Sequence, residues 1–279
     1  MTKNLQRTSD EWRALLRKNR IKPSKAMGQN FLTETAVVEE IVELSGIGTG
    51  DLVIEIGPGM GILSRQIIAS GAMLIGVELD RELAALLRSD LAEEKSFSLV
   101  EKDARYLNPE ELTGGKPYQV VANLPYSVAT VILRNLMESA HPPTRMTVMV
   151  QKEVAERMTA EPGTMSLLGL ATDLYADANI VMVVPPEVFL PPPKVGSAVV
   201  QLDTRPELRG TPQQRDRMFE LATMAFQRKR KTLVNGLSMG LDRPKAELET
   251  ILAGIGIDSK RRPQELGVDE WLQIAEILP

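Results

Sequence analysis

The residues Asn123-Leu-Pro-Tyr126 form the most chemically specific stretch of this 279-residue sequence. They follow the apolar run 118–122, which predicts a buried strand. Asn123 offers an amide oxygen, Leu124 a main-chain carbonyl, Pro125 a stiff turn and Tyr126 a flat ring. Two acceptors beside a ring suit an exocyclic amine such as N6 of adenine, which carries two hydrogens. The competing interpretation is an ordinary Asn-Pro turn that starts a helix.

A second candidate site is the glycine corner Gly57-Pro-Gly59-Met-Gly61, which follows the β-branched run 53–56. A strand that enters a glycine turn and then a helix lets a ligand approach the backbone and meet free N–H groups. A dinucleotide fingerprint would require a third glycine where Ile62 stands. The spacing therefore argues against a nicotinamide cofactor.

Carboxylates at the ends of the next two predicted strands favour a nucleoside-bearing cofactor. Glu78 closes one strand and can accept hydrogen bonds from ribose hydroxyls, and Asp103-Ala104 closes the other and can accept from an adenine amino group. S-adenosylmethionine has no pyrophosphate and tolerates the acidic Glu55 beside the glycines. We therefore expect S-adenosyl-L-methionine as the cofactor, with methyl transfer driven by positioning and oriented dipoles.

The composition excludes several other kinds of site. The chain has no cysteine and a single histidine, His141, so a disulfide, a thiolate nucleophile and a His-based metal site are not expected. No apolar run reaches the length of a membrane span, and the N-terminus lacks the apolar core of a signal peptide. We expect a cytoplasmic protein with no membrane partner and no metal.

Three basic clusters stand out from a net charge of −4. Six cations and no acid lie between Trp12 and Thr33, and the runs 228–231 and 260–262 add more. Local positive fields can hold phosphates on an acidic protein, although each cluster alone could be a solvated surface. The run Arg228, Lys229, Arg230 and Lys231 is the candidate RNA-binding segment.

Strand and helix patterns alternate from Asp51 onward, as in a doubly wound α/β sheet. Ligands of such sheets bind outside the carboxyl ends of the strands where the strand order reverses. Only helical patterns follow residue 205. We expect a domain over 1–204, with 1–33 as a basic N-terminal segment, and a small helical RNA-contacting domain over 205–279. Strands are predicted at 51–56, 72–78, 97–101, 118–123, 145–151, 179–184 and 197–202, with helices at 34–44, 61–70, 81–92, 127–139, 152–160 and 166–176.

The order of several motifs resembles the ribosomal RNA adenine N6,N6-dimethyltransferases, and within them the bacterial small-subunit (16S) branch. The resemblance implies a Rossmann-like class I S-adenosylmethionine-dependent methyltransferase sheet. It also implies that Tyr126 and Phe189 sandwich a flipped adenine. The motifs are Gly28–Leu32, Glu55–Gly59, Glu78–Asp80, Asp103-Ala104, Asn123–Tyr126, 151–157, 189–195 and 225–233. The cofactor-binding residues implied are Gln29, Asn30, Leu32, Gly57, Gly59, Glu78, Asp103, Ala104 and Asn123.

By the same resemblance the substrate would be small-subunit rRNA within a pre-ribosomal 30S particle, and the enzyme a monomer that dimethylates two adjacent adenosines. Two alternatives stay open. One is a large-subunit rRNA adenine N6-methyltransferase of the antibiotic-resistance type. The other is a ribosome-assembly or transcription factor that keeps the fold without turnover, although Asn123 and Tyr126 are intact. A Rossmann oxidoreductase is a distant further possibility.

Overall fold

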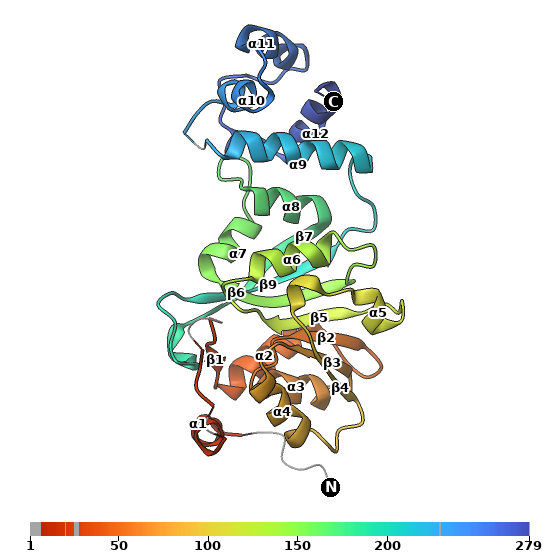
Figure 1. Cartoon of the computed structure of the whole chain (residues 1–279), viewed down its shortest axis with the longest axis vertical. Coiled ribbons are helices and arrows are strands. Elements are labelled where there is room, and N and C mark those ends of the chain that lie inside the picture. The colour runs from red at the N-terminus through yellow and green to blue at the C-terminus, as the bar shows by residue number, and fades with distance from the viewer. Residues whose placement is uncertain (1–6, 20, 25–27, 229, 279) are drawn as a thin grey trace. The chain divides into compact units, whose positions relative to one another are not determined.

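The computed structural model describes residues 7–19, 21–24, 28–228 and 230–278 (Figure 1). The chain forms two compact units. The first contains the residues up to Ala155 together with Ala178–Thr204, and the second contains Glu156–Asp177 and the residues from Arg205 onward. The domain predicted from the sequence over 1–204 included the segment 156–177. The structure joins this segment to the second unit because its apolar residues, among them Leu170 and Leu174, pack into the helical core.

A seven-stranded sheet organises the first unit, in the order β4-β3-β2-β5-β6-β9-β7. The neighbours from β4 to β6 pair in parallel, and β9 pairs antiparallel with β6. Sequence order reverses between β2 and β5, so the carboxyl ends of these two strands border the expected crevice. The bounds are β2 Leu52–Ile56, β3 Met73–Glu78, β4 Phe97–Glu101, β5 Gln119–Asn123, β6 Arg145–Gln151, β7 Ala176–Val184 and β9 Ser197–Thr204.

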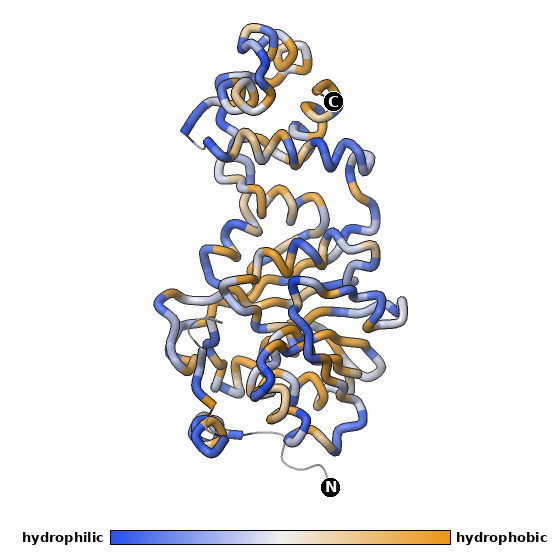
Figure 2. Tube along the Cα trace, viewed as in Figure 1, coloured by the Kyte–Doolittle hydropathy of each residue, from blue (hydrophilic) through white to orange (hydrophobic). Residues whose placement is uncertain are grey.

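Helices connect these strands at the predicted places, and the short helix at 109–113 is an addition that was not predicted. The buried faces of the helices at 35–45, 62–69 and 81–90 join the strands in one hydrophobic cluster that includes Val38, Ile67 and Leu87, and apolar residues run along the strands in Figure 2. The helix predicted from Glu34 ends at Gly46, whose φ of 68° stops it. The helices are α2 Thr35–Ser45, α3 Ile62–Ala69, α4 Arg81–Asp90, α5 Pro109–Thr113, α6 Ala129–Met137 and α7 Lys152–Met158, with 3-10 turns η1 Ala104–Tyr106 and η2 Pro186–Val188.

A second, two-stranded sheet holds the N-terminal segment against the chain far downstream. In it β1 (Phe31–Leu32) pairs antiparallel with β8 (Phe189–Leu190). Thr33, which follows β1, donates its backbone N–H and its hydroxyl to the Val188 carbonyl. The cap position is occupied by Glu34. This long-range contact is favourable because it satisfies both the buried backbone N–H and the buried hydroxyl of Thr33.

The second unit is helical and has its own core. A cluster centred on Trp271 and Phe226 buries the apolar faces of its helices. The helices are α8 Leu167–Tyr175, α9 Pro212–Phe226, α10 Leu233–Leu241, α11 Lys245–Gly254 and α12 Val268–Ile277, with the 3-10 turn η3 Pro263–Glu265. Within the described residues, none of the helices of either unit is long and apolar enough to span a membrane.

Candidate active site

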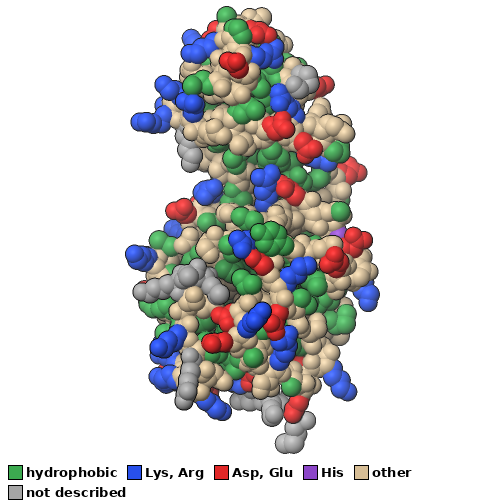
Figure 3. Space-filling view, in the orientation of Figure 1, with side chains coloured by type: hydrophobic (Ala, Val, Ile, Leu, Met, Phe, Trp, Pro, Cys, Tyr) green, Lys and Arg blue, Asp and Glu red, His purple; other side chains and the backbone are tan. Residues whose placement is uncertain are grey.

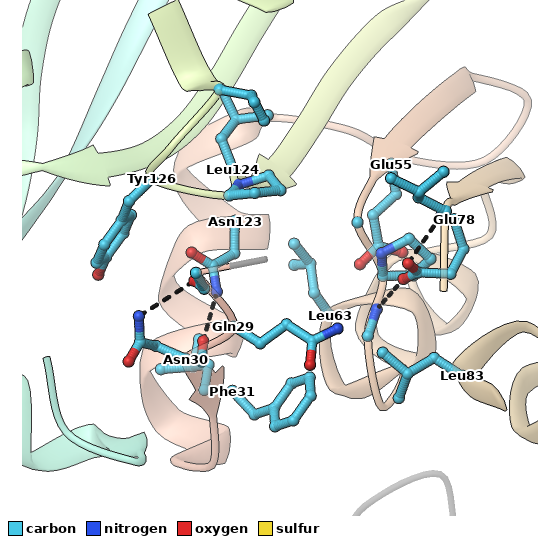
Figure 4. Close-up of a pocket in the computed structure, with 18 of the residues that line it drawn as sticks. Gln29, Asn30, Phe31, Glu55, Leu63, Glu78, Leu83, Asn123, Leu124 and Tyr126 are labelled. Carbon is cyan, nitrogen blue, oxygen red and sulfur yellow. Dashed lines mark hydrogen bonds between the residues drawn. The ribbon is translucent and has the colours of Figure 1, made fainter. Parts of the chain in front are cut away.

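A cavity of about 440 Å³ opens at the carboxyl ends of β2, β3 and β5 (Figure 4). It carries the carboxyl groups of three acidic residues, and we call it the acidic cavity. Most of the residues predicted to form the site line it, although they come from five separate parts of the sequence. Those residues are Gln29, Asn30, Leu32, Gly57, Gly59, Glu78, Asp103, Asn123, Leu124, Pro125 and Tyr126.

The glycine corner forms one wall of the acidic cavity. Gly57 and Gly59 have φ angles of 67° and 59°, in the left-handed region that glycine adopts without strain. A Cβ on Gly59 would stand 3.2 Å from the ring of Phe31, so a side chain there would push against the N-terminal loop. The predicted corner therefore exists, and it leaves room for a ligand at the backbone.

Glu78 points into the acidic cavity and is held by backbone donors (Figure 4). Its Oε1 accepts hydrogen bonds from Leu79 N and Asp80 N at 2.9 Å each, and its Oε2 accepts one from Gly59 N at 3.0 Å. Burial raises the pKa of this carboxyl, and the three hydrogen bonds oppose part of that rise. A carboxylate oxygen can accept two hydrogen bonds, so Oε2 has capacity for a ligand hydroxyl.

Glu55 is a second acid of the acidic cavity, and it is almost wholly buried. Ser64 Oγ donates to its Oε2 at 2.5 Å. Burial, more than the nearby Glu78, raises the pKa of Glu55 to about 8. The side chain is therefore protonated near neutral pH and puts no full negative charge beside the glycines.

This raised pKa predicts a pH-dependent stability. Below the ordinary value of 4.5, Glu55 is protonated in both the folded and the unfolded chain. Between 4.5 and about 8 only the folded state keeps the proton, so the free energy of unfolding contributed by Glu55 falls as the pH rises, and the loss is complete above about 8. Denaturant unfolding should show Glu55→Gln losing less stability than the parent protein between pH 5 and pH 8.5. Parallel pH curves for the two proteins would contradict a buried, protonated Glu55.

Asn123 lies at the end of β5, and its amide group is oriented by the N-terminal loop. Its Nδ2 donates to the carbonyl of Asn30 at 3.4 Å, and Asn30 Nδ2 in turn donates to the Gly28 carbonyl at 3.3 Å (Figure 4). Because Nδ2 is directed to Asn30, the Oδ1 atom remains as the acceptor for a ligand in the acidic cavity. No hydrogen bond to Oδ1 is present within the described part of the chain.

The turn that follows Asn123 is held by backbone hydrogen bonds. Leu124 N donates to Met149 O and Val128 N donates to Pro125 O, each at 3.1 Å. A Cβ on Gly57 would contact the Pro125 ring at 3.6 Å, so the turn and the glycine corner are neighbours. Tyr126 is fixed by a 2.6 Å hydrogen bond between its hydroxyl and Ser197 Oγ, and burial raises its pKa.

Three of the predicted site residues are not free to contact a ligand in the acidic cavity as expected. Phe189 is 2% exposed within the hydrophobic core and does not line the acidic cavity. A stacking role for its ring would therefore require Phe189 to leave this buried position. Ala104 starts η1 and is not part of the cavity wall. The carboxylate of Asp103 does line it, but is bound by Arg105 Nη2 at 2.6 Å, and this hydrogen bond lowers the Asp103 pKa.

Several residues of the acidic cavity were not predicted from the sequence. Arg105, Leu79, Leu63 and Leu83 line it together with the residues described above. Leu79 stands between Glu78 and Asp80 and could have been found as part of that strand end. Leu63 and Leu83 fit the apolar spacing of a helix, and this pattern does not predict contact with a ligand. The sequence around Arg105 does not distinguish this residue from a cation exposed to solvent.

The described residues of the basic run in the second unit lie in a turn. Arg228, Arg230 and Lys231 are exposed between the end of α9 and the start of α10, and Lys231 N donates to Arg228 O at 2.8 Å. Lys229 lies outside the described residues. In the third cluster, Arg261 is bound by Glu270 and by the Glu265 carbonyl, so that cation has a structural role.

Comparisons with solved structures bear on the fold. The chain is similar to a dimethyladenosine transferase from Plasmodium falciparum, with a TM-score of 0.74, 23% identity, and coverage of 88% of this chain and 95% of that one. It is also similar to the 23S rRNA methyltransferase ErmE, with a TM-score of 0.70, 24% identity, and coverage of 89% and 99%. The predicted class I methyltransferase fold is confirmed.

Comparisons at the sequence level bear on the family. Relatives named ribosomal RNA small subunit methyltransferase A, from Alkaliphilus metalliredigens and Moorella thermoacetica, are each 37% identical to this chain. The first alignment covers 95% of this chain and 94% of the relative, and the second covers 95% and 96%. The sequence profile described as "Ribosomal RNA adenine dimethylase" matches residues 20–279. The chain therefore belongs to the ribosomal RNA adenine dimethylase family.

Proposed function

We propose that this protein transfers methyl groups from S-adenosyl-L-methionine to N6 of two adjacent adenosines of small-subunit 16S rRNA, dimethylating each. The observation that carries the proposal is the orientation of Asn123, whose amide nitrogen is bound to Asn30 so that its oxygen is left for an amine. The family and the named relatives support rRNA as the substrate. We further propose that the enzyme acts as a monomer on an immature 30S particle in the cytoplasm.

The residues of the acidic cavity fit S-adenosylmethionine. Glu78 Oε2 would accept a ribose hydroxyl, and the backbone of Gly57 and Gly59 lines the cavity beside it. Asp103 would accept from the adenine amino group, once Arg105 shares or releases its carboxylate. When bound, this cofactor supplies an electrophilic methyl group on a positively charged sulfur, and the carboxylates of the cavity favour such a cation.

Asn123 and Leu124 would prepare the nucleophile. Their oxygens can accept the two N6 hydrogens of the target adenine, which turns the nitrogen lone pair out of conjugation and toward the methyl group. The hydrogen bond to Asn30 fixes one of these acceptors before the substrate arrives, so little reorganisation is needed during transfer. The Tyr126 ring would stack on the adenine, which must leave its base stack to reach the cavity. The N6 proton is lost after methylation, when the nitrogen is strongly acidic, so no side-chain base is required.

The test of this function is subunit preference. Immature small subunits, immature large subunits and mature small subunits are each incubated with the protein and labelled S-adenosylmethionine. We expect label only in the rRNA of immature small subunits. Label in the large subunit would identify the antibiotic-resistance type of methyltransferase, and an absence of label with tight particle binding would identify a non-catalytic assembly factor.

We also expect the basic turn at 228–231 to hold RNA by charge without a part in the chemistry. Replacing Arg228, Lys229, Arg230 and Lys231 with glutamine should weaken rRNA binding and lower its salt dependence by about one slope unit per lost phosphate contact. Single-turnover methylation at saturating RNA should stay near the parental rate.

The control for this prediction is Lys245→Gln, which removes an exposed cation from α11 of the same unit. It should leave both the RNA affinity and the salt slope unchanged. If the quadruple variant binds RNA like the control, the basic turn is only a solvated surface.

A further inference from the structure

A second cavity, of about 900 Å³, adjoins the acidic cavity and is formed by the N-terminal helix α1 (Ser9–Lys18). The two cavities share four lining residues, Gly28, Gln29, Asn30 and Tyr126. We call the second cavity the α1 groove. Because Tyr126 borders both, a ligand in the α1 groove would lie next to the proposed position of the target adenine.

The pairing of β1 with β8 brings the walls of the α1 groove together. Leu190 pairs with Phe31, so the loop 191–195 that leaves β8 faces the residues that lead into β1. This loop lines one side of the groove, and α1 with Ile21 and Pro23 lines the other. The groove is therefore built by two segments that are about 160 residues apart in the sequence.

Helix α1 is anchored firmly to the sheet domain. Trp12 is 1% exposed, and the guanidinium groups of Arg7 and Arg65 lie 5.0 and 6.0 Å from the centre of its ring. Asp90 forms ion pairs with both arginines. Cation–π contacts and a shared carboxylate fix both the position and the rotation of the helix. The positions on α1 from which the arginine side chains extend are thus fixed before any ligand binds.

The charges of the two cavities are opposite. The α1 groove is lined by three cations, Arg13, Arg17 and Lys194, and by no carboxylate among the described residues. The acidic cavity beside it is lined by the carboxylates of Glu78 and Asp103, by the protonated Glu55, and by one cation, Arg105, which is paired with Asp103. The remaining wall of the groove is largely apolar, with Leu16, Ile21 and a run of prolines. Cations above an apolar floor suit a ligand with anionic groups and uncharged rings.

Arg13 and Arg17 are spaced to contact neighbouring anionic groups. They are four residues apart on α1, which places them one helical turn, about 5–6 Å, apart on the same face. Arg13 also approaches Asp10 at 3.4 Å, but both side chains are well exposed, so this pair is weak and leaves the guanidinium available.

We propose that the α1 groove holds the strand that flanks the target adenosine, with Arg13 and Arg17 on its phosphates. This inference rests on the proposed function, and it assigns to α1 a part in RNA recognition that is separate from the basic turn at 228–231. A flipped adenosine pulls its neighbours out of the helical stack, and their backbone must then be held close to the catalytic turn. Lys and Arg side chains gather over α1 at the lower left of Figure 3.

The test compares charge removal inside and outside the groove on the same helix. The variants are Arg17→Gln, the double variant Arg13→Gln with Arg17→Gln, and the control Lys18→Gln, which removes an exposed cation that does not line the groove. The probe is an unmethylated small-subunit rRNA fragment that contains the target adenosines. Its Kd is measured over a range of salt, together with the Kd for S-adenosylmethionine.

We expect Arg17→Gln to weaken binding of the fragment about tenfold and the double variant more, with the salt slope lowered by about 0.7 per lost contact, as for a single strand. Lys18→Gln should bind like the parent protein, and S-adenosylmethionine affinity should not change. Equal RNA affinities and slopes for Arg17→Gln and Lys18→Gln, with a parent protein that methylates rRNA, would overturn the inference. A parent protein that does not methylate rRNA would overturn the proposed function instead.

Discussion

Replacing Asn123 with alanine should lower the single-turnover rate of rRNA methylation by about a hundredfold or more, which is the scale of losing one oriented polar group from a transition state. The variant loses the Oδ1 acceptor that would hold the adenine N6. It also loses the 3.4 Å hydrogen bond to Asn30, whose carbonyl belongs to the loop beside the cavity. The fold and most of the affinity for S-adenosylmethionine should be retained, because Glu78 and the glycine corner are untouched.

The matched variant for this prediction is Tyr126→Ala. Loss of its ring should weaken capture of the target by about 1–3 kcal/mol, the usual contribution of stacking one base on an aromatic side chain. It should therefore raise the RNA concentration needed for half-maximal rate more than it lowers the rate at saturation. An Asn123→Ala protein that methylates at the parental single-turnover rate would show that the turn is only scaffolding.

The second large effect is expected at Glu78. Glu78→Gln keeps the size of the side chain but removes the charge that accepts from Gly59 N and, as proposed, from a ribose hydroxyl. Hydrogen bonds to charged groups contribute about 1.5–3 kcal/mol, so S-adenosylmethionine should bind roughly ten- to a hundredfold more weakly. Glu78→Lys, which places a cation beside a cationic ligand, should abolish detectable binding.

Isothermal calorimetry of the free protein measures these affinities directly. Glu82→Gln is the control, because Glu82 is exposed on α4 and does not line the acidic cavity. It should bind S-adenosylmethionine like the parent protein. Undiminished binding by Glu78→Gln, or tight binding of NAD by the parent protein in place of S-adenosylmethionine, would contradict the assignment of this carboxylate.

Local patterns were sufficient to predict the central part of the fold. The strands β2 and β5 are short apolar runs bounded by Gly57 and by Asn123, and such runs have a strong strand signal. The general rule for parallel sheets then predicted that the two strand ends meet, as they do where Gly57 faces Pro125. The acidic cavity was predictable because its chemistry follows strand ends.

Features that depend on contacts distant in the sequence were not predictable. The strands β1 and β8 have two residues each, too few for any periodic pattern, yet their pairing buries Phe189 and binds Thr33. The assignment of 156–177 to the helical unit likewise follows from packing of Leu170 and Leu174 rather than from composition. The α1 groove depends on the pairing of β1 with β8, and only its cations could be predicted from the sequence.

The most direct test of the central claim is to identify the nucleoside that the protein makes. Immature small subunits are incubated with S-adenosylmethionine and either the parent protein or Asn123→Ala, and the rRNA is digested and analysed by mass spectrometry. We predict two N6,N6-dimethyladenosines per particle with the parent protein and almost none with Asn123→Ala in the same time. Dimethyladenosine formed equally by both proteins, or a methyl group on any atom other than N6, would contradict the role proposed for the Asn123 turn.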